Sequence, residues 1–149
     1  MNEIISIRPA EKDDFEFARR THHLAYHDVV VKQFGNWDEK MQDGFFERSW
    51  VPETHQIIYF NEAPAGYCSF IYYPDHIFAS ELVILPEFQG KGIGSKLLSD
   101  LIKESDEKVI PIKLQVLKQN KAQGLYRRLG YKDVEEEETH IKMEYVPSV

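Results

Sequence analysis

A glycine-rich loop between an apolar run and an amphipathic segment constrains this chain more than any other feature of its sequence. The loop holds three glycines within five residues, Gly90, Gly92 and Gly94, and it follows the apolar run Leu82–Leu85. Apolar side chains recur at helical spacing from Ile93 onwards, so the order is strand, tight loop and helix. Backbone N–H groups that converge at a helix N-terminus favour an anion. The sequence therefore predicts a phosphate cradle.

Two common phosphate-binding loops do not fit this segment. A P-loop closes with Gly-Lys-Ser/Thr, whereas here Ser95 precedes Lys96. A Rossmann fingerprint needs Gly-x-Gly-x-x-Gly after the first strand of a βαβ unit and an acidic residue near the end of the next strand. The glycine spacing differs, and no acidic residue ends the apolar-alternating segment 112–117. Neither of these two classes of phosphate-binding loop therefore accounts for the segment.

Length, charge and cysteine content narrow the class of protein. The chain has 149 residues and a net charge of −7, which suits one domain over residues 1–149 and disfavours nucleic acid as a partner. We expect no membrane span and no signal peptide, because long apolar runs are missing and the N-terminal stretch is polar. A single cysteine, Cys68, excludes an internal disulfide framework and a cysteine-based zinc site. These features predict a cytoplasmic protein without a membrane partner.

Periodic patterns along the chain predict an α+β fold with one mixed sheet. Strands are expected at residues 4–8, 56–60, 65–73, 77–85, 112–117, 131–137 and 140–145. Helices are expected from residue 13 or 14 to 35, from 36 or 38 to 50, from 93 to the segment 103–108, and from 120 to 129. The second helix should bury Trp37, Met41, Phe45 and Phe46. The strands at 56–60 and 65–73 should form a hairpin, and those at 77–85 and 112–117 should be parallel because a helix lies between them.

Two motifs together resemble the GCN5-related N-acetyltransferase (GNAT) family. The family signature Gln/Arg-x-x-Gly-x-Gly/Ala is matched by Gln89–Gly94, and a second element, Asn-x-x-Ala-x-x-Leu-Tyr-x-x-x-Gly-Phe, by Asn120–Tyr131. Two departures are visible, because Ala122 comes one position early and Tyr131 replaces Phe. The resemblance implies the GNAT fold, with about four helices and a mixed, mostly antiparallel sheet of about six or seven strands, whose parallel βαβ unit is splayed at the acetyl-coenzyme A site.

The resemblance implies acetyl-coenzyme A as co-substrate. Its pyrophosphate would lie on backbone N–H groups of the glycine loop, and its pantetheine arm would pair with the preceding strand. The cofactor-binding residues implied are Leu82, Val83, Ile84, Gln89, Gly90, Lys91, Gly92, Ile93, Gly94, Ser95, Asn120 and Tyr126. The Ile84 N–H would also stabilise the oxyanion that forms at the thioester carbonyl. Alternatives are a plain tight turn for the glycines, a buried strand for Leu82–Leu85, and a simple helix cap for Asn120.

The resemblance also suggests which side chains would move protons. Tyr126 would protonate the departing thiolate, although a core aromatic at helical spacing is the alternative. Glu81, three residues before Ile84, is the candidate general base. The alternatives for Glu81 are an exposed strand carboxylate and a contact to the positive charge of the substrate. Some members of the family instead carry a glutamate on the next strand. The corresponding position here is Gln115, whose amide cannot serve as the base.

The first helices and the closing strands of the family wall the acceptor pocket. The substrate-binding candidates are accordingly Tyr26, His27, Trp37 and His140. No metal is expected, because among His22, His23 and His27 only His23 and His27 share a helix face. Cys68 is interpreted as a packing residue, with an acyl-cysteine route as the alternative.

The resemblance implies transfer of an acetyl group from acetyl-coenzyme A to a primary amine, by direct attack in a ternary complex. We expect a small-molecule amine as acceptor, and the net charge of −7 would suit a cationic one. Two alternatives stay open at this point. One is a non-catalytic acyl-coenzyme A-binding or sensor module, and the other is an acetyltransferase for protein N-termini or lysines. A homodimer is also left open.

Overall fold

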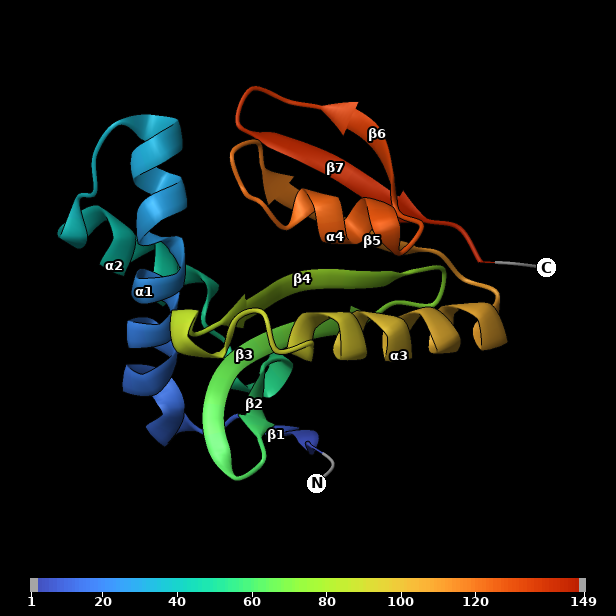
Figure 1. Cartoon of the computed structure of the whole chain (residues 1–149), viewed down its shortest axis with the longest axis horizontal. Helices are drawn as coiled ribbons and strands as arrows, with labels where there is room; N and C mark the ends of the chain where they lie inside the picture. The colour runs from blue at the N-terminus through green and yellow to red at the C-terminus, as the bar shows by residue number, and fades with distance from the viewer. Residues whose placement is uncertain (1–2, 148–149) are drawn as a thin grey trace. The chain divides into compact units, whose positions relative to one another are not determined.

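The computed structural model describes residues 3–147 and forms, within them, seven strands, four α-helices and three short 3-10 helices (Figure 1). The strands are β1 (Ile5–Pro9), β2 (Gln56–Phe60), β3 (Ala63–Tyr72), β4 (Ile77–Ile84), β5 (Ile112–Leu117), β6 (Lys132–Glu136) and β7 (His140–Tyr145). The α-helices are α1 (Phe15–Phe34), α2 (Glu39–Ser49), α3 (Ile93–Lys108) and α4 (Gln123–Arg128). The 3-10 helices are η1 (Lys12–Asp14), η2 (Pro52–Thr54) and η3 (Pro86–Phe88). The strand order in the sheet is β1-β2-β3-β4-β5-β7-β6, which confirms the predicted α+β class.

Residue contacts divide the chain into two compact units. The first unit comprises the described residues up to Ser69 together with Glu81–Ile93, and the second comprises Phe70–Ser80 and the described residues from Gly94 onwards. The expected single domain over residues 1–149 stays a prediction. None of the helices within residues 3–147 has the length and apolar character needed to cross a membrane.

Antiparallel pairing builds the sheet of the first unit. Strand β1 pairs with β2 through Ile5↔Phe60, and β2 pairs with β3 through Gln56↔Cys68, so the predicted hairpin is confirmed. Gly66 on β3 lies against the backbone of β4, where an added Cβ would come to 2.1 Å from the carbonyl oxygen of Val83. Glycine at position 66 therefore permits a close approach between these two strands.

Two helices pack against each other and against this sheet. The buried cluster Ala18, Phe46, Ile57, Tyr67 and Val83 joins α1 and α2 to the strands. Helix α1 ends at Gly35, which has φ +93° and donates its N–H to Val31 O. The Asp38 side chain caps α2 by accepting the N–H of Met41.

The predicted inner face of α2 was largely wrong. Gln42 and Phe46 point inward, whereas Met41 and Phe45 are 54% and 48% exposed and Trp37 precedes the helix. Positions 42 and 46 are four residues apart and share one face, so 41 and 45 form the adjacent stripe. Aromatic side chains occur on both stripes, and apolarity alone therefore could not select the buried one.

The second unit contains the predicted parallel βαβ connection. Ile77 and Phe78 at the start of β4 pair in parallel with Ile112 and Lys113 of β5, and α3 lies between the two strands in sequence. Strand β7 then pairs antiparallel with both β5 and β6. The core of this unit holds nine buried side chains, namely Ile77, Ala79, Leu101, Ile112, Leu114, Val116, Tyr131, Ile141 and Met143.

Candidate active site

The glycine loop of the first unit has the left-handed backbone that only glycine adopts readily. Gly90 has φ +78° and Gly92 has φ +83°, while an added Cβ at either position would meet nothing within 4 Å. Their role in the loop is conformational, because an L side chain would be strained at these φ values even though the surrounding space is open.

The surroundings of the loop leave its backbone accessible. Residues 89–92 are exposed, and the chain turns directly from Gly92 into α3, whose first residue Ile93 is buried. The Gln89 side chain donates from Nε2 to Ile84 O at 3.0 Å, which ties the loop to the end of β4. The first N–H groups of a helix have no intrahelical acceptor. An exposed loop that leads into such a helix start is suited to holding an anion.

Glu81 of β4 is hydrogen-bonded to a histidine that sequence reasoning missed. His55 Nε2 lies 2.6 Å from Glu81 Oε2, and His55 Nδ1 lies 2.7 Å from Val51 O. The side chain of His55 is 3% exposed and that of Glu81 is 18% exposed, so Glu81 is not the exposed strand carboxylate of the alternative interpretation. The Trp50 ring covers His55, with ring centroids 4.7 Å apart. His55 could not be found from a local pattern because it is separated from Glu81 by 26 residues.

Tyr67 places a buried hydroxyl near this carboxylate. The side chain is fully buried, and its hydroxyl has no hydrogen-bond partner within the part of the chain that the structure describes. Burial, followed by the charge of Glu81, raises the pKa of Tyr67 well above its usual value. The phenol therefore stays neutral at physiological pH, as a donor without a partner among the described residues.

The second unit carries Asn120 and Tyr126, the remaining motif residues. The predicted helix 120–129 begins only at Gln123, and Asn120 Oδ1 instead accepts the N–H of Ala122 at 2.9 Å. The side-chain NH₂ of Asn120 is then the part that can donate to a ligand. The ring of Tyr126 packs against the core with its centroid 5.8 Å from that of Tyr131, and burial raises the pKa of Tyr126 to about 12. Tyr126 is thus partly a core aromatic, and it keeps its proton at neutral pH.

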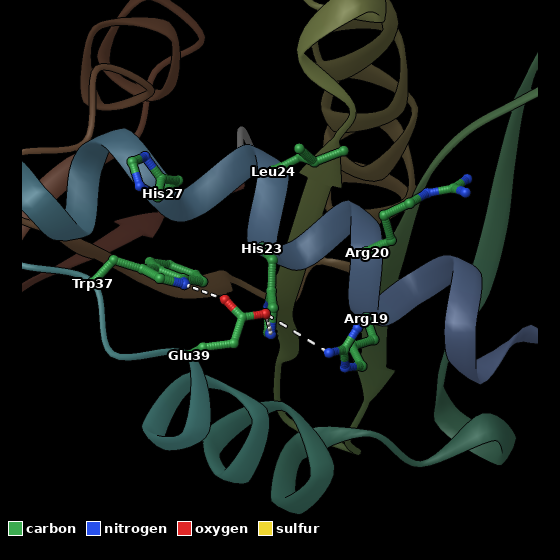
Figure 2. Close-up of a pocket in the computed structure, with 7 residues that line it drawn as sticks. All are labelled: Arg19, Arg20, His23, Leu24, His27, Trp37 and Glu39. Carbon is green, nitrogen blue, oxygen red and sulfur yellow. Dashed lines mark hydrogen bonds and ion pairs between the residues drawn. The ribbon is translucent and has the colours of Figure 1, made fainter.

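The four predicted acceptor-side residues separate into three places. His27 and Trp37 lie together in a pocket on the first unit, with ring centroids 5.4 Å apart (Figure 2). The pocket is lined by Arg19, Arg20, His23, Leu24, His27, Trp37 and Glu39. The Tyr26 ring instead lies against that of His22, with centroids 4.9 Å apart and an angle of 43° between the ring planes. His140 lies on β7 of the second unit, where its Nδ1 is 2.7 Å from Thr139 Oγ1.

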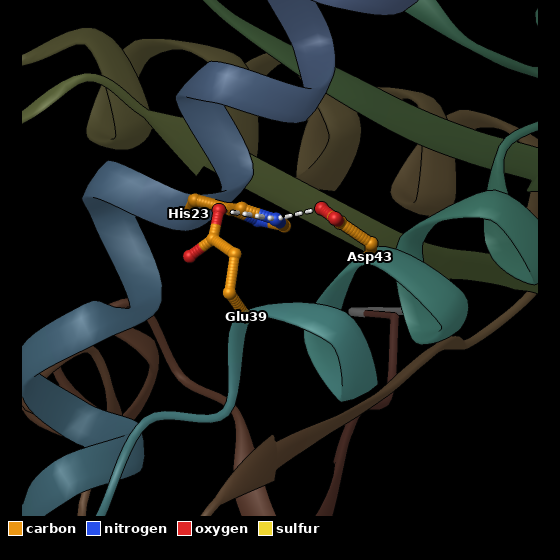
Figure 3. Close-up of side chains that lie close together, drawn as sticks. All are labelled: His23, Glu39 and Asp43. Carbon is orange, nitrogen blue, oxygen red and sulfur yellow. Dashed lines mark hydrogen bonds and ion pairs between the residues drawn. The ribbon is translucent and has the colours of Figure 1, made fainter.

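His23 is grouped with two carboxylates of α2, an arrangement that the sequence did not predict. Its Nε2 lies 2.7 Å from Asp43 Oδ1 and 3.7 Å from Glu39 Oε1 (Figure 3). Such a set of nitrogen and oxygen donors has the chemistry of a metal site. Arg19 already contacts both carboxylates, at 3.0 Å from Asp43 and 3.7 Å from Glu39, and its charge balances part of theirs. The expectation of no metal stays a prediction.

The sequence and the fold were compared with known proteins. A family model described as "Acetyltransferase (GNAT) domain" matches residues 47–133. Comparison with curated protein sequences gave no match. Among solved structures, the PaiA N-acetyltransferase of Thermoplasma acidophilum in complex with coenzyme A is similar with a TM-score of 0.76 and 19% identity, covering 96% of this chain and 99% of that chain.

Two further structures share the fold. An acetyltransferase of Thermus thermophilus has a TM-score of 0.72 and 18% identity, over 95% of this chain and 96% of that one. The ribosomal-protein alanine N-acetyltransferase of Escherichia coli has a TM-score of 0.67 and 20% identity, over 98% and 96%. The mixed sheet and the glycine loop before α3 define an acyltransferase of the acetyl-coenzyme A-dependent N-acetyltransferase class. Since the family model spans more than half of the sequence, the chain belongs to the GNAT acetyltransferase family.

Proposed function

We propose that this protein transfers the acetyl group of acetyl-coenzyme A directly to the primary amine of a small-molecule acceptor. The observation that carries the proposal is the exposed loop with left-handed Gly90 and Gly92, placed directly before the buried first residue of α3. This is the local geometry that an anionic pyrophosphate requires. The neighbour from Thermoplasma acidophilum, which is in complex with coenzyme A, supports the same ligand.

Three segments of the chain share the proposed cofactor-binding roles. The backbone of Gln89–Ser95 would hold the pyrophosphate, Leu82–Ile84 would pair with the pantetheine arm, and the Asn120 NH₂ group would donate to it. The Ile84 N–H would stabilise the oxyanion. We expect the reaction to proceed without a metal ion, and Arg19 already contacts both carboxylates of the His23 cluster.

The chemistry needs three proton transfers. The ammonium of the acceptor gives a proton to Glu81, and the freed lone pair attacks the thioester carbonyl carbon. The carbon–sulfur bond then breaks, the thiolate takes the proton of Tyr126, and the acylated nitrogen loses its second proton, which restores the Tyr126 phenol and leaves a neutral amide. The partly buried position of Glu81 and the protonated state of Tyr126 at neutral pH support these roles. Tyr26, His27, Trp37 and His140 stay candidates for contacting the acceptor.

An acceptor screen tests the proposal. Purified protein with acetyl-coenzyme A is offered diamines, polyamines, amino sugars, amino acids and peptides with a free N-terminus, and thiol release is followed. Turnover with a small amine supports the proposal. Turnover with peptides alone would mean that the acceptor is a protein or peptide and not a small molecule. Binding of acetyl-coenzyme A by calorimetry without any turnover would indicate a sensor module instead.

A further inference from the structure

We propose that His55 and Glu81 share one proton and act as a unit, so that the proton acceptor for the incoming amine is this pair rather than Glu81 alone. The inference rests on the proposed function for its catalytic consequence. The sharing of the proton rests only on the geometry of the first unit. In this scheme His55 is a positioning residue that acts through Glu81.

The acceptors on both sides of the His55 ring determine where its protons lie. Nδ1 is 2.7 Å from the carbonyl oxygen of Val51, and a carbonyl oxygen can only accept, so Nδ1 carries a hydrogen. The Thr54 hydroxyl lies 3.2 Å from the same carbonyl oxygen and 3.4 Å from Nδ1, and its hydrogen, directed at either atom, does not lie between Nδ1 and the carbonyl oxygen. A neutral imidazole has one N–H, and in His55 this N–H is the one at Nδ1, which donates to the Val51 carbonyl.

The second ring nitrogen therefore requires an additional proton. His55 Nε2 lies 2.6 Å from Glu81 Oε2, and a lone pair facing an ionised carboxylate at this distance is repulsive. A proton between the two atoms converts the contact into a short, charge-assisted hydrogen bond. The proton makes the pair either an imidazolium with a carboxylate or an imidazole with a carboxylic acid. Both forms hold one proton between Oε2 and Nε2.

The surroundings hold the pair in this geometry. His55 is buried, and the Trp50 and Tyr67 rings lie with centroids 4.7 Å and 5.9 Å from its own. The titratable groups that face the pair are Tyr67 from β3 and, beyond it, Tyr26 from α1. Both are phenols, which ordinarily lose a proton only near pH 10, so they add no charge at neutral pH.

The shared position gives the reaction a place to put the substrate proton. When the pair has lost its shared proton, Glu81 is an ionised carboxylate beside a neutral imidazole. An N–H bond of the acceptor ammonium then breaks, its electron pair stays on the amine nitrogen, and the proton enters through Glu81 to lie between Oε2 and Nε2. The neutral amine can then attack the thioester, and no other reactant is needed.

Replacing His55 by glutamine should change the pH dependence of the reaction. His55→Gln keeps an N–H donor beside Glu81 but removes the titrating ring, and coupled groups titrate as a pair. An imidazole ordinarily titrates about two pH units above a carboxylic acid. We expect the midpoint of the rising limb of kcat/KM to move to lower pH by at least about one unit and kcat to fall about tenfold, with KM for acetyl-coenzyme A little changed. An unshifted profile in an active His55→Gln variant would overturn the proposal.

Nuclear magnetic resonance tests the pair without an acceptor. In the full-length protein labelled with ¹⁵N and ¹³C, the ring nitrogens of His55 and the carboxyl carbon of Glu81 are followed from pH 5 to pH 9. We expect Nδ1 to stay protonated, Nε2 and the carboxyl carbon to titrate together, and Glu81→Gln to shift the ring titration to lower pH. An unprotonated Nδ1, or a ring titration that Glu81→Gln leaves unchanged, contradicts the shared proton.

A surface pair provides the matched control. His76 Nδ1 lies 2.7 Å from Asp75 Oδ1, but the Asp75 side chain is 84% exposed. His76→Gln should leave both the pH profile and the His55 signals unchanged. If acetyl-coenzyme A neither binds nor turns over with any amine of the panel, the proposed function fails, whereas the resonance data decide the His55–Glu81 pair separately.

Discussion

At the scale of single residues, buried tyrosine hydroxyls occur both beside the candidate site and in the core. Two tyrosine hydroxyls, those of Tyr67 and Tyr131, are buried without a hydrogen-bond partner within residues 3–147. A buried polar atom without a partner costs about 1–3 kcal/mol. The Tyr67 hydroxyl lies near Glu81 of the candidate site, whereas Tyr131 belongs to the core of the second unit, so the two hydroxyls can be compared.

Replacing Tyr67 by phenylalanine tests this distinction. Tyr67→Phe keeps the ring and removes the unpartnered hydroxyl, so we expect stability to stay equal or rise by up to about 1 kcal/mol. Urea unfolding measures the change, and Tyr131→Phe in the core of the second unit is the matched control. A loss of stability in Tyr67→Phe would mean that the hydroxyl has a partner, such as a buried water molecule.

The role of Tyr126 is separated from its packing by a similar substitution. Tyr126→Phe keeps the contacts with the core and removes the only proton that the side chain can donate. If Tyr126 protonates the thiolate, kcat should fall about 10²–10⁴-fold while acetyl-coenzyme A still binds. Steady-state thiol release and calorimetry give the two values. Wild-type turnover in this variant would leave Tyr126 as a core residue alone.

At the scale of elements, the connection from β4 to α3 combines a left-handed backbone with exposure to solvent. Gly90 and Gly92 provide two left-handed residues, and the buried Ile93 fixes the start of the helix. The loop also joins β4 through the Gln89 contact to Ile84 O. A change in loop conformation would therefore disturb the end of β4 as well as the start of α3.

Gly92→Val tests the conformational role of this loop. A β-branched residue at φ +83° is strained, and relaxing the loop would turn its N–H groups away from a common anion. We expect at least tenfold weaker binding of acetyl-coenzyme A by calorimetry, and retained secondary structure by circular dichroism. Gly124→Ala serves as the control, since Gly124 lies in α4 rather than in the loop. Undiminished binding in Gly92→Val would remove the loop from the coenzyme site.

At the scale of the whole molecule, the sequence predicted what depends on local pattern. All seven strands were placed to within about two residues, because each carries an alternating or β-branched run bounded by turn residues. Glu81 was chosen because it lies three residues before Ile84 on the same strand, and its role as a base stays a prediction. His55, Asp43 and the buried face of α2 were not found, since each is defined by a partner on another element. Contacts between residues far apart in the chain produce no periodic pattern in a single sequence, so periodicity cannot predict them.

Acid should destabilise the fold through His22. Burial, followed by the charge of His23, lowers the pKa of His22 to about 4. The unfolded chain binds this proton near pH 6.5 and the folded chain only near pH 4, so stability falls as the pH drops through that window. Between pH 7.5 and pH 5 we expect a loss of about 2 kcal/mol that His22→Phe largely removes, measured by urea unfolding. The exposed His27, changed to Gln, is the control, and an equal pH dependence in wild type and His22→Phe would contradict the assignment.

The contact at Gly66 has a consequence for how the activity of this protein would be mapped. No side chain fits at this position, since even a methyl group would overlap the Val83 carbonyl at 2.1 Å. Val83 lies between Glu81 and Ile84 in the chain, so a displaced β4 would carry both groups with it. A mutational scan scored on turnover would rank Gly66 beside Glu81 and Ile84, the proposed catalytic groups, because a substitution at Gly66 would displace the strand that carries them. The loss of turnover would thus originate within the sheet, at a residue whose missing side chain makes room for the Val83 carbonyl oxygen.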